Sequence, residues 1–181
     1  MTTHSTRLML VVVCLIVGLA AAAHAKHTEL PRVRPLDASL TVIVDAGSHR
    51  SNTFHALVER LEAGDVVVYL QHAQLPSGLQ GRLTFLTEAA GLRYVMVEVT
   101  RDLDVPRLIA IVGHELQHAV EILEQPQIVS QATFASAYQR TGFKRRHFAD
   151  GAVGFDTHAA VDVGRQVWRE LAGSALTLAT R

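Results

Sequence analysis

The stretch IVGHELQHAVE, residues 111–121, decides how the rest of the chain is interpreted. Two histidines, His114 and His118, stand four residues apart, and Glu115 follows the first of them. Residues four apart lie one above the other on the same face of an α-helix. A helical stretch would therefore let both imidazoles bind one metal ion, and zinc accepts histidine nitrogens at about 2.0–2.1 Å.

The apolar residues around this stretch have the period of a long helix. After Pro106 they recur three or four positions apart until Pro126, which cannot continue a helix. The set consists of Leu108, Ile109, Val112, Leu116, Ala119, Val120 and Leu123. The pattern therefore predicts that the two histidines and the glutamate lie in the middle of a half-buried helix.

Glu115 lies about 100° around such a helix from His114, so it is poorly placed to bind the same ion. It can instead polarise a water molecule that fills an open coordination position. Zinc lowers the pKa of its bound water towards about 7, and a carboxylate that accepts the proton produces a nucleophile at neutral pH. The spacing therefore predicts a general base at Glu115.

The motif HELQHAV resembles the active-site helix of the zincin metallopeptidases. It is especially similar to the gluzincin, thermolysin-like version, which reads HELTHAV. The resemblance implies that His114 and His118 are ligands of Zn²⁺ and that Glu115 is the general base. It also implies a small zincin-like catalytic domain in which zinc-bound water, activated by Glu115, attacks a peptide carbonyl.

Catalytic zinc sites usually have three protein ligands and one water, so a third ligand is expected. Thermolysin-like enzymes take a glutamate from a following helix, but the corresponding window, Tyr138–Phe143, contains no carboxylate. Metzincins turn the chain with a glycine where this sequence has Glu121. The candidates that remain are Glu121, His147, Asp150, Asp156 and His158.

The segment FDTHAAVDVGRQVWREL, residues 155–171, favours Asp156 as the third ligand. Asp156 extends the apolar stripe of this segment at its N-terminal end, whereas His158 falls on the polar face. A carboxylate on a buried face requires a partner, which a zinc ion on the facing helix would supply. The alternative is that Asp156 or Thr157 only caps the helix. An aspartate in place of the longer glutamate would require the two helices to lie closer together.

The other candidates have simpler interpretations. Glu121 shares a helical face with His114 and His118, and three ligands from one helix crowd one side of the ion. It is interpreted as a partner of His118 or as a solvent-exposed residue. His147 and Asp150 lie in a polar stretch and are interpreted as exposed.

The remaining patterns predict an α+β domain with a mostly antiparallel sheet and one early helix, followed by the motif helix and C-terminal helices. The expected strands are Thr41–Val44, Asp65–Leu70, Arg82–Thr87 and Arg93–Thr100, the last two forming a hairpin. The other expected helices are Asn52–Ala63, Ser130–Arg140 and Asp156–Ala172, with an arm at residues 26–40 and an irregular stretch at 142–154.

Residues 1–25 have the pattern of a secretory signal peptide, with Arg7 before the apolar run LMLVVVCLIVGL and cleavage expected after Ala25. The run is shorter than the roughly 20 residues that span a bilayer, so no stable membrane insertion is expected, and an uncleaved anchor is the alternative. The protein is therefore expected to be secreted or periplasmic, with residues 26–181 as one domain. The only cysteine, Cys14, lies in this leader, so the domain contains no disulfide.

The formal net charge is zero and no basic stripe is present, so a nucleic-acid partner is not expected. The leading hypothesis is an exported zinc-dependent metallopeptidase that acts on a peptide or protein substrate. The strand Arg93–Thr100 is a candidate for holding that substrate by edge pairing. The alternative is a non-catalytic exported module that binds a metal or a partner. No pattern indicates the oligomeric state.

Overall fold

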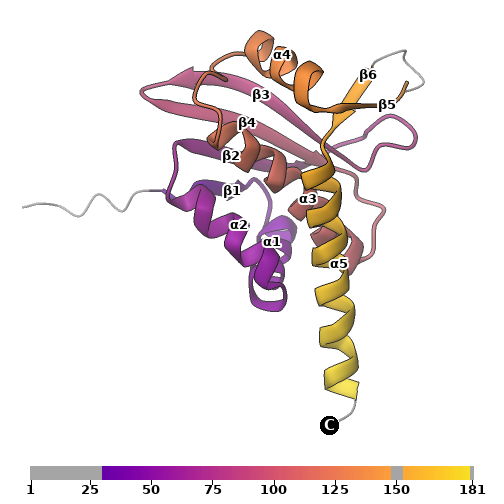
Figure 1. Cartoon of the computed structure of the whole chain (residues 1–181). Coiled ribbons are helices and arrows are strands. Elements are labelled where there is room, and N and C mark those ends of the chain that lie inside the picture. Colours follow the sequence, from indigo (N-terminus) through magenta and orange to yellow (C-terminus); the bar gives the residue numbers. More distant parts are fainter. Residues whose placement is uncertain (1–29, 148–152, 180–181) are drawn as a thin grey trace, which may run out of the picture. The chain divides into compact units, whose positions relative to one another are not determined.

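The computed structural model describes residues 30–147 and 153–179, and the predicted signal peptide lies outside these residues. The fold is α+β (Figure 1). The helices are α1 (Ala38–Arg50), α2 (Asn52–Glu62), α3 (Val105–Leu123), α4 (Gln131–Thr141) and α5 (His158–Ala179). The strands are β1 (Val33–Pro35), β2 (Val66–His72), β3 (Gly81–Ala89), β4 (Leu92–Val99), β5 (Phe143–His147) and β6 (Val153–Asp156). Over the described ranges, none of these helices is both long and apolar enough to cross a bilayer.

The larger sheet is mixed and has the strand order β1-β2-β4-β3. β2 is parallel to β1 and to β4, and β3 is antiparallel to β4 at the edge. The expectation of a mostly antiparallel sheet is therefore wrong. Alternation of apolar residues shows which face of a strand is buried, but not the order of the strands. After β2 the chain forms β3 two positions away in the sheet. β4, which follows β3 in sequence, then pairs with both strands and lies between them.

The hairpin of β3 and β4 is confirmed. Its turn contains Ala90 and Gly91, which have φ angles of 52° and 75°. Two consecutive residues in the left-handed region are characteristic of the type I′ turn, whose twist matches that of the two strands.

The first helix, α1, corrects the prediction of a strand at Thr41–Val44. The side chain of Asp37 caps this helix by accepting a hydrogen bond from the backbone N–H of Leu40. Leu40, Ile43 and Gly47 form its buried face, so tertiary packing outweighs the low helix propensity of the β-branched residues. In the part of the chain that the structure describes, two helices therefore precede β2 instead of one.

The C-terminal third also departs from the prediction. The stretch expected to be irregular contains an antiparallel pair, β5 and β6, which form a separate small sheet. Asp156 is the last residue of β6, and α5 begins two residues later at His158. The side chain of Thr157 accepts a hydrogen bond from the backbone N–H of Ala160 at 3.1 Å, so Thr157 caps this helix and Asp156 does not.

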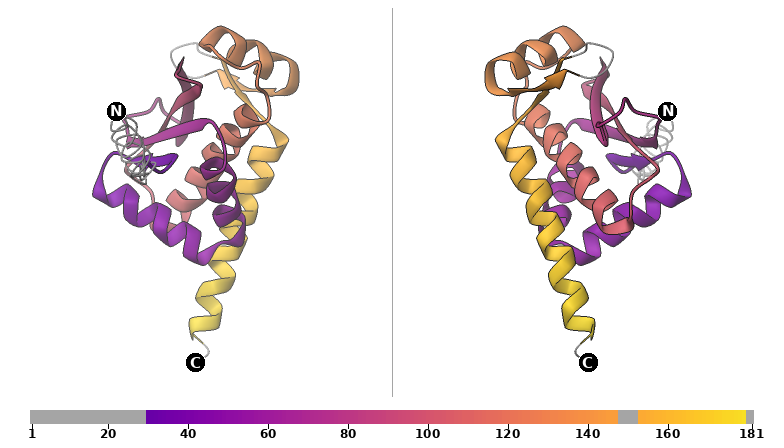
Figure 2. Two further views of the ribbon diagram at one scale, coloured as in Figure 1. Left: turned by 90° about the vertical axis from the view of Figure 1, so that its left-hand side faces the viewer. Right: turned by 90° about the vertical axis from the view of Figure 1, so that its right-hand side faces the viewer.

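The motif helix α3 lies in the middle of the fold. Asp104 caps its start by accepting a hydrogen bond from the backbone N–H of Arg107, and Pro106 lies in its first turn. The helix contacts β2, β3 and β4 of the sheet and also α5, which runs beside it (Figure 2). Its side chains are therefore buried on both sides, including the predicted site residues.

A buried arginine holds the C-terminal end of α3. The guanidinium of Arg93, on β4, is 3% exposed and donates to the carbonyl oxygens of Ile122 at 2.6 Å and Gln125 at 2.9 Å. It also forms an ion pair with Asp65 at 2.6 Å. Because the last carbonyls of a helix lack partners within the helix, this cation both satisfies them and complements the helix dipole.

Candidate metal centre

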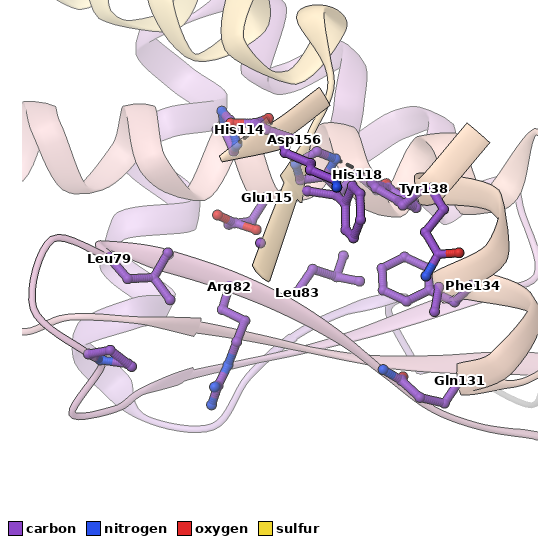
Figure 3. Close-up of a pocket in the computed structure, with 17 residues that line it drawn as sticks. Leu79, Arg82, Leu83, His114, Glu115, His118, Gln131, Phe134, Tyr138 and Asp156 are labelled. Atoms are coloured by element: carbon purple, nitrogen blue, oxygen red, sulfur yellow. Dashed lines mark hydrogen bonds and ion pairs between the residues drawn. The ribbon is translucent and has the colours of Figure 1, made fainter. Parts of the chain in front are cut away.

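Three side chains from two parts of the chain converge beside α3. His114 and His118 project from the middle of this helix, and Asp156 reaches them from the end of β6 (Figure 3). Oδ1 of Asp156 lies 3.3 Å from Nε2 of His114 and 3.5 Å from Nε2 of His118. The three side chains are buried, with exposures of 9%, 6% and 1% in chain order.

This group has the donor atoms and spacing of a metal site. One donor atom from each of the three residues lies within 4.8 Å of the other two. Donors bound at about 2.0–2.1 Å around a tetrahedral ion lie about 3.4 Å from one another, close to the separations of 3.3 Å and 3.5 Å in this structure. Two imidazoles and one carboxylate are also a known ligand set of catalytic zinc. The group could therefore hold a metal ion.

Glu121 is not a member of this group but orients His118 through Nδ1, the ring nitrogen that does not face Asp156. Its Oε2 accepts a hydrogen bond from Nδ1 of His118 at 2.9 Å and from the Tyr138 hydroxyl at 2.7 Å. Its Oε1 accepts from the hydroxyl of Thr157 at 2.5 Å. Burial raises the pKa of the Glu121 carboxyl, but the bond and charge of His118 outweigh burial and keep that pKa below its usual range. Glu121 is thus the partner of His118 that the helical spacing indicated.

The same neighbours act on His118. Burial lowers the pKa of its imidazole, but hydrogen bonds to Asp156 and Glu121 outweigh burial and raise that pKa to about 9. A proton and a metal ion would therefore compete for the Nε2 atom that faces Asp156. Tyr138 remains a phenol that can donate, because burial and then the charge of Glu121 raise its pKa.

Glu115 lies beside the three-residue group and points from α3 towards β3 (Figure 3). It is 5% exposed and lines the same cavity. A Cβ atom built on Gly81 of β3 would overlap Oε1 of Glu115 and would come within 2.8 Å of Cγ2 of Ile111. The absence of a side chain at Gly81 therefore makes room for the Glu115 carboxylate.

The cavity has a volume of about 830 Å³, within the range that holds small ligands and peptide segments. The start of β3, helices α3 and α4 and the β5–β6 pair contribute to its wall. Its apolar lining includes Leu79, Leu83, Phe134 and Phe155, and its polar lining includes Arg82, Gln131, Gln139 and Lys144. The candidate metal ligands thus lie on the wall of a cavity that could admit a substrate.

The remaining candidates for the third ligand fall elsewhere. His158 is exposed, and its ring lies 4.8 Å from that of Phe143. Asp150 and the side chain of His147 lie outside the described residues. Gly81 was not singled out by the sequence pattern, and Thr157 was considered only as a helix cap, because a glycine and a cap residue carry no chemical signature of their own.

No protein-family model matches the chain, and neither curated proteins nor solved structures give a significant match. The function must therefore be inferred from the motif and from the chemistry of the site.

Proposed function

We propose that the protein is an exported, zinc-dependent hydrolase of peptide bonds. The observation that carries this proposal is the position of the Glu115 carboxylate beside His114, His118 and Asp156 on the wall of one cavity. The resemblance of HELQHAV to the zincin motif and the leader-like pattern of residues 1–25 support it. A zinc ion held by the three side chains would polarise the scissile carbonyl and lower the pKa of the attacking water.

Glu115 is the proton carrier in this proposal. It takes a proton from the attacking water while the water oxygen bonds to the carbonyl carbon. It then donates that proton to the leaving nitrogen as the C–N bond breaks, so the products are a carboxylic acid and an amine. Glu115 is 5% exposed, and this burial strengthens its electrostatic effect on the reacting groups.

β3, and not β4, is positioned to hold an extended substrate. The strand expected for this role, Arg93–Thr100, corresponds to β4, which lies between β2 and β3 and so has no open edge. The backbone N–H of Thr100 donates to the Gln80 carbonyl at 3.1 Å, so Gln80 points its carbonyl towards β4. Because backbone groups alternate along a strand, those of Gly81 and Leu83 point to the opposite edge.

That outer edge of β3 borders the cavity. Gly81 and Leu83 both line it, and within the described parts of the chain no strand pairs with β3 on this side. A peptide that added to this edge would pass in front of the three-residue group, with main-chain hydrogen bonds supplying affinity.

A specific observation also favours a second function. Oδ1 of Asp156 lies within ion-pair distance of both histidines, and Glu121 lies within that distance of His118, so a protonated His118 can pair with both carboxylates in place of a metal. The second candidate is therefore a non-catalytic exported module in which this network stabilises the contact of α3 with the β6–α5 junction.

Metal analysis separates these two functions. We expect the purified protein to bind one zinc ion per chain and Asp156→Ala to bind zinc far more weakly, as measured by mass spectrometry of the metal and by chelator competition. His158→Ala is the control, because this exposed histidine was an alternative ligand. A folded wild-type protein that binds no zinc, even when zinc is supplied, favours the non-catalytic module.

Catalysis is tested with Glu115→Gln. We expect this variant to retain zinc and to lose about 10²–10⁴-fold in the rate of cleavage of a quenched-fluorescent peptide library. Glu124→Gln is the matched control, since Glu124 lies at the end of the same helix but is paired with Arg60 on the surface. Cleavage that is equal in Glu115→Gln and wild type would exclude Glu115 as the base.

A further inference from the structure

Helices α3 and α5 approach each other closely at a glycine that faces a candidate ligand. A Cβ atom built on Gly164 of α5 would lie 3.2 Å from Cβ of His114, 3.5 Å from the carbonyl oxygen of Ala110 and 3.6 Å from Nδ1 of His114. The first of these distances is shorter than ordinary van der Waals contact between carbon atoms. The two nearest atoms are fixed to the α3 backbone, so they cannot rotate out of the way.

A second glycine lies in the same helix contact. Gly113 of α3 faces α5, and a Cβ atom built there would lie 3.1 Å from Cγ2 of Val167 and 3.4 Å from Cδ2 of Phe54. Val167 and Phe54 are fully buried, so the interior offers little space for displacement. Gly113 of α3 thus faces α5, and Gly164 of α5 faces α3 beside His114.

The spacing of these helices matters because the third candidate ligand is short. Asp156 immediately precedes the Thr157 cap of α5, so a displacement of the helix would also displace its carboxylate. An aspartate reaches about 1.5 Å less far than a glutamate, the length of one carbon–carbon bond. Its Oδ1 nevertheless lies 3.3 Å and 3.5 Å from the two imidazole nitrogens.

We infer that Gly164 is a positioning residue of the metal centre: its lack of a side chain brings α5 close enough to His114 for the short Asp156 carboxylate to share one ion with both histidines. This inference rests on the metal site of the proposed function, but it does not depend on peptidase activity. The close packing of α5 on α3 thus sets the distance between the candidate ligands, in addition to stabilising the core.

The test compares two glycine substitutions in the same helix. Gly164→Ala adds a methyl group against His114, whereas Gly173→Ala adds one where, among the described residues, no heavy atom outside the chain neighbours and the backbone of α5 itself lies within 4 Å. Both variants gain the same helix propensity, so that effect cancels in the comparison. Zinc affinity is measured by chelator competition, and the visible absorption of the cobalt-loaded protein reports the coordination geometry.

We expect Gly164→Ala to bind zinc about 10–100-fold more weakly than wild type, the range seen when groups that orient a ligand are lost. Its cobalt spectrum should change, whereas Gly173→Ala should match wild type in both measurements. Wild-type affinity and an unchanged spectrum in Gly164→Ala would overturn the inference and leave the proposed site intact. A folded wild-type protein that binds no zinc would overturn both.

A second variant tests the spacing without disturbing the helix contact, which matters if Gly164→Ala does not fold. Asp156→Glu keeps a carboxylate but lengthens it, so at the native spacing it should crowd His114 and His118 and weaken zinc binding. If Asp156→Glu binds zinc as tightly as wild type, the spacing is not matched to aspartate and the inference is wrong.

Discussion

Glu121 and His118 lie one helical turn apart on α3, and Oε2 of Glu121 accepts a hydrogen bond from Nδ1 of His118 at 2.9 Å. The bond fixes the orientation of the imidazole so that its other nitrogen faces Asp156. A carboxylate in this position makes a metal-binding histidine more basic and prevents its ring from rotating. We therefore expect Glu121 to support metal binding at the candidate site, although it is not among the three candidate ligands.

We expect Glu121→Gln to weaken zinc affinity about 10–100-fold, because the neutral amide orients His118 less strongly and no longer raises its basicity. Chelator competition measures this change. Tyr138→Phe is the comparison: it removes a hydroxyl that contacts both Glu121 and Nδ1 of His118 but leaves the carboxylate of Glu121 paired with His118, so its effect should be smaller. Equal affinities in Glu121→Gln and wild type would show that the pair does not support metal binding.

Gly81→Ala should separate catalysis from metal binding. The new methyl group would occupy the space of Oε1 of Glu115, and the flexible end of that side chain would move aside. We expect the rate of peptide cleavage to fall at least about tenfold, since a general base must lie within hydrogen-bond reach of the water. Zinc content should remain at the wild-type level, because the atoms nearest to the new methyl group belong to Glu115 and Ile111 and not to His114, His118 or Asp156. Loss of zinc together with activity would contradict this explanation.

Arg93→Met should destabilise the fold strongly. The substitution removes the charge that satisfies the last carbonyls of α3 and leaves Asp65 without its ion pair. We expect the free energy of unfolding to fall by about 3 kcal/mol, as for other buried charged hydrogen-bond networks. Urea unfolding measures this change. Arg82→Met on β3 is the matched control, because its pair with Glu98 is half exposed and should contribute at most about 1 kcal/mol.

The lowered pKa of the Glu170 carboxyl predicts that the folded protein becomes less stable in acid. Burial raises the pKa of its carboxyl, but hydrogen bonds from Ser51, Gln166 and Thr53 outweigh burial and lower that pKa to about 2 from 4.5. A folded-state pKa below the unfolded value stabilises the fold above pH 4.5, and this contribution is lost as the pH falls towards 2.

Thermal unfolding between pH 7 and pH 2 tests this prediction. Glu170→Gln should be less stable than wild type at pH 7, and the difference should shrink as the pH falls below 4.5. Glu59→Gln, at a residue whose side chain is 68% exposed, should follow the wild-type profile. A difference between Glu170→Gln and wild type that stays constant with pH would exclude the carboxylate as its cause.

Much of the secondary structure could be predicted because its signals are local. The helices α2, α3 and α4 and the β3–β4 hairpin lie within a few residues of their expected bounds. The errors occur where distant contacts decide the outcome. Thr41–Val44 is helical because Ile43 packs into the core from a capped helix, and β4 is parallel to β2 because β3 lies outside it. Neither fact is encoded within the segment concerned.

The candidate site likewise has a part that local sequence signals predict and a part that depends on distant contacts. The spacing of His114, Glu115 and His118 places the two imidazoles on one face of α3, because backbone hydrogen bonds set the helical period whatever surrounds the helix. Asp156 could be favoured from its periodicity, although the structure places it at the end of a strand and not within a helix.

The contact between Asp156 and His114 depends on tertiary structure alone. Residues far apart in sequence are brought within 3.3 Å by the packing of α5 on α3, and Gly164 permits that packing. The contact of Gly81 with Glu115 likewise exists only because the start of β3 lies beside α3. Local hydrogen bonding thus decides which side chains share a helical face, whereas close packing between distant segments decides which of them form a site.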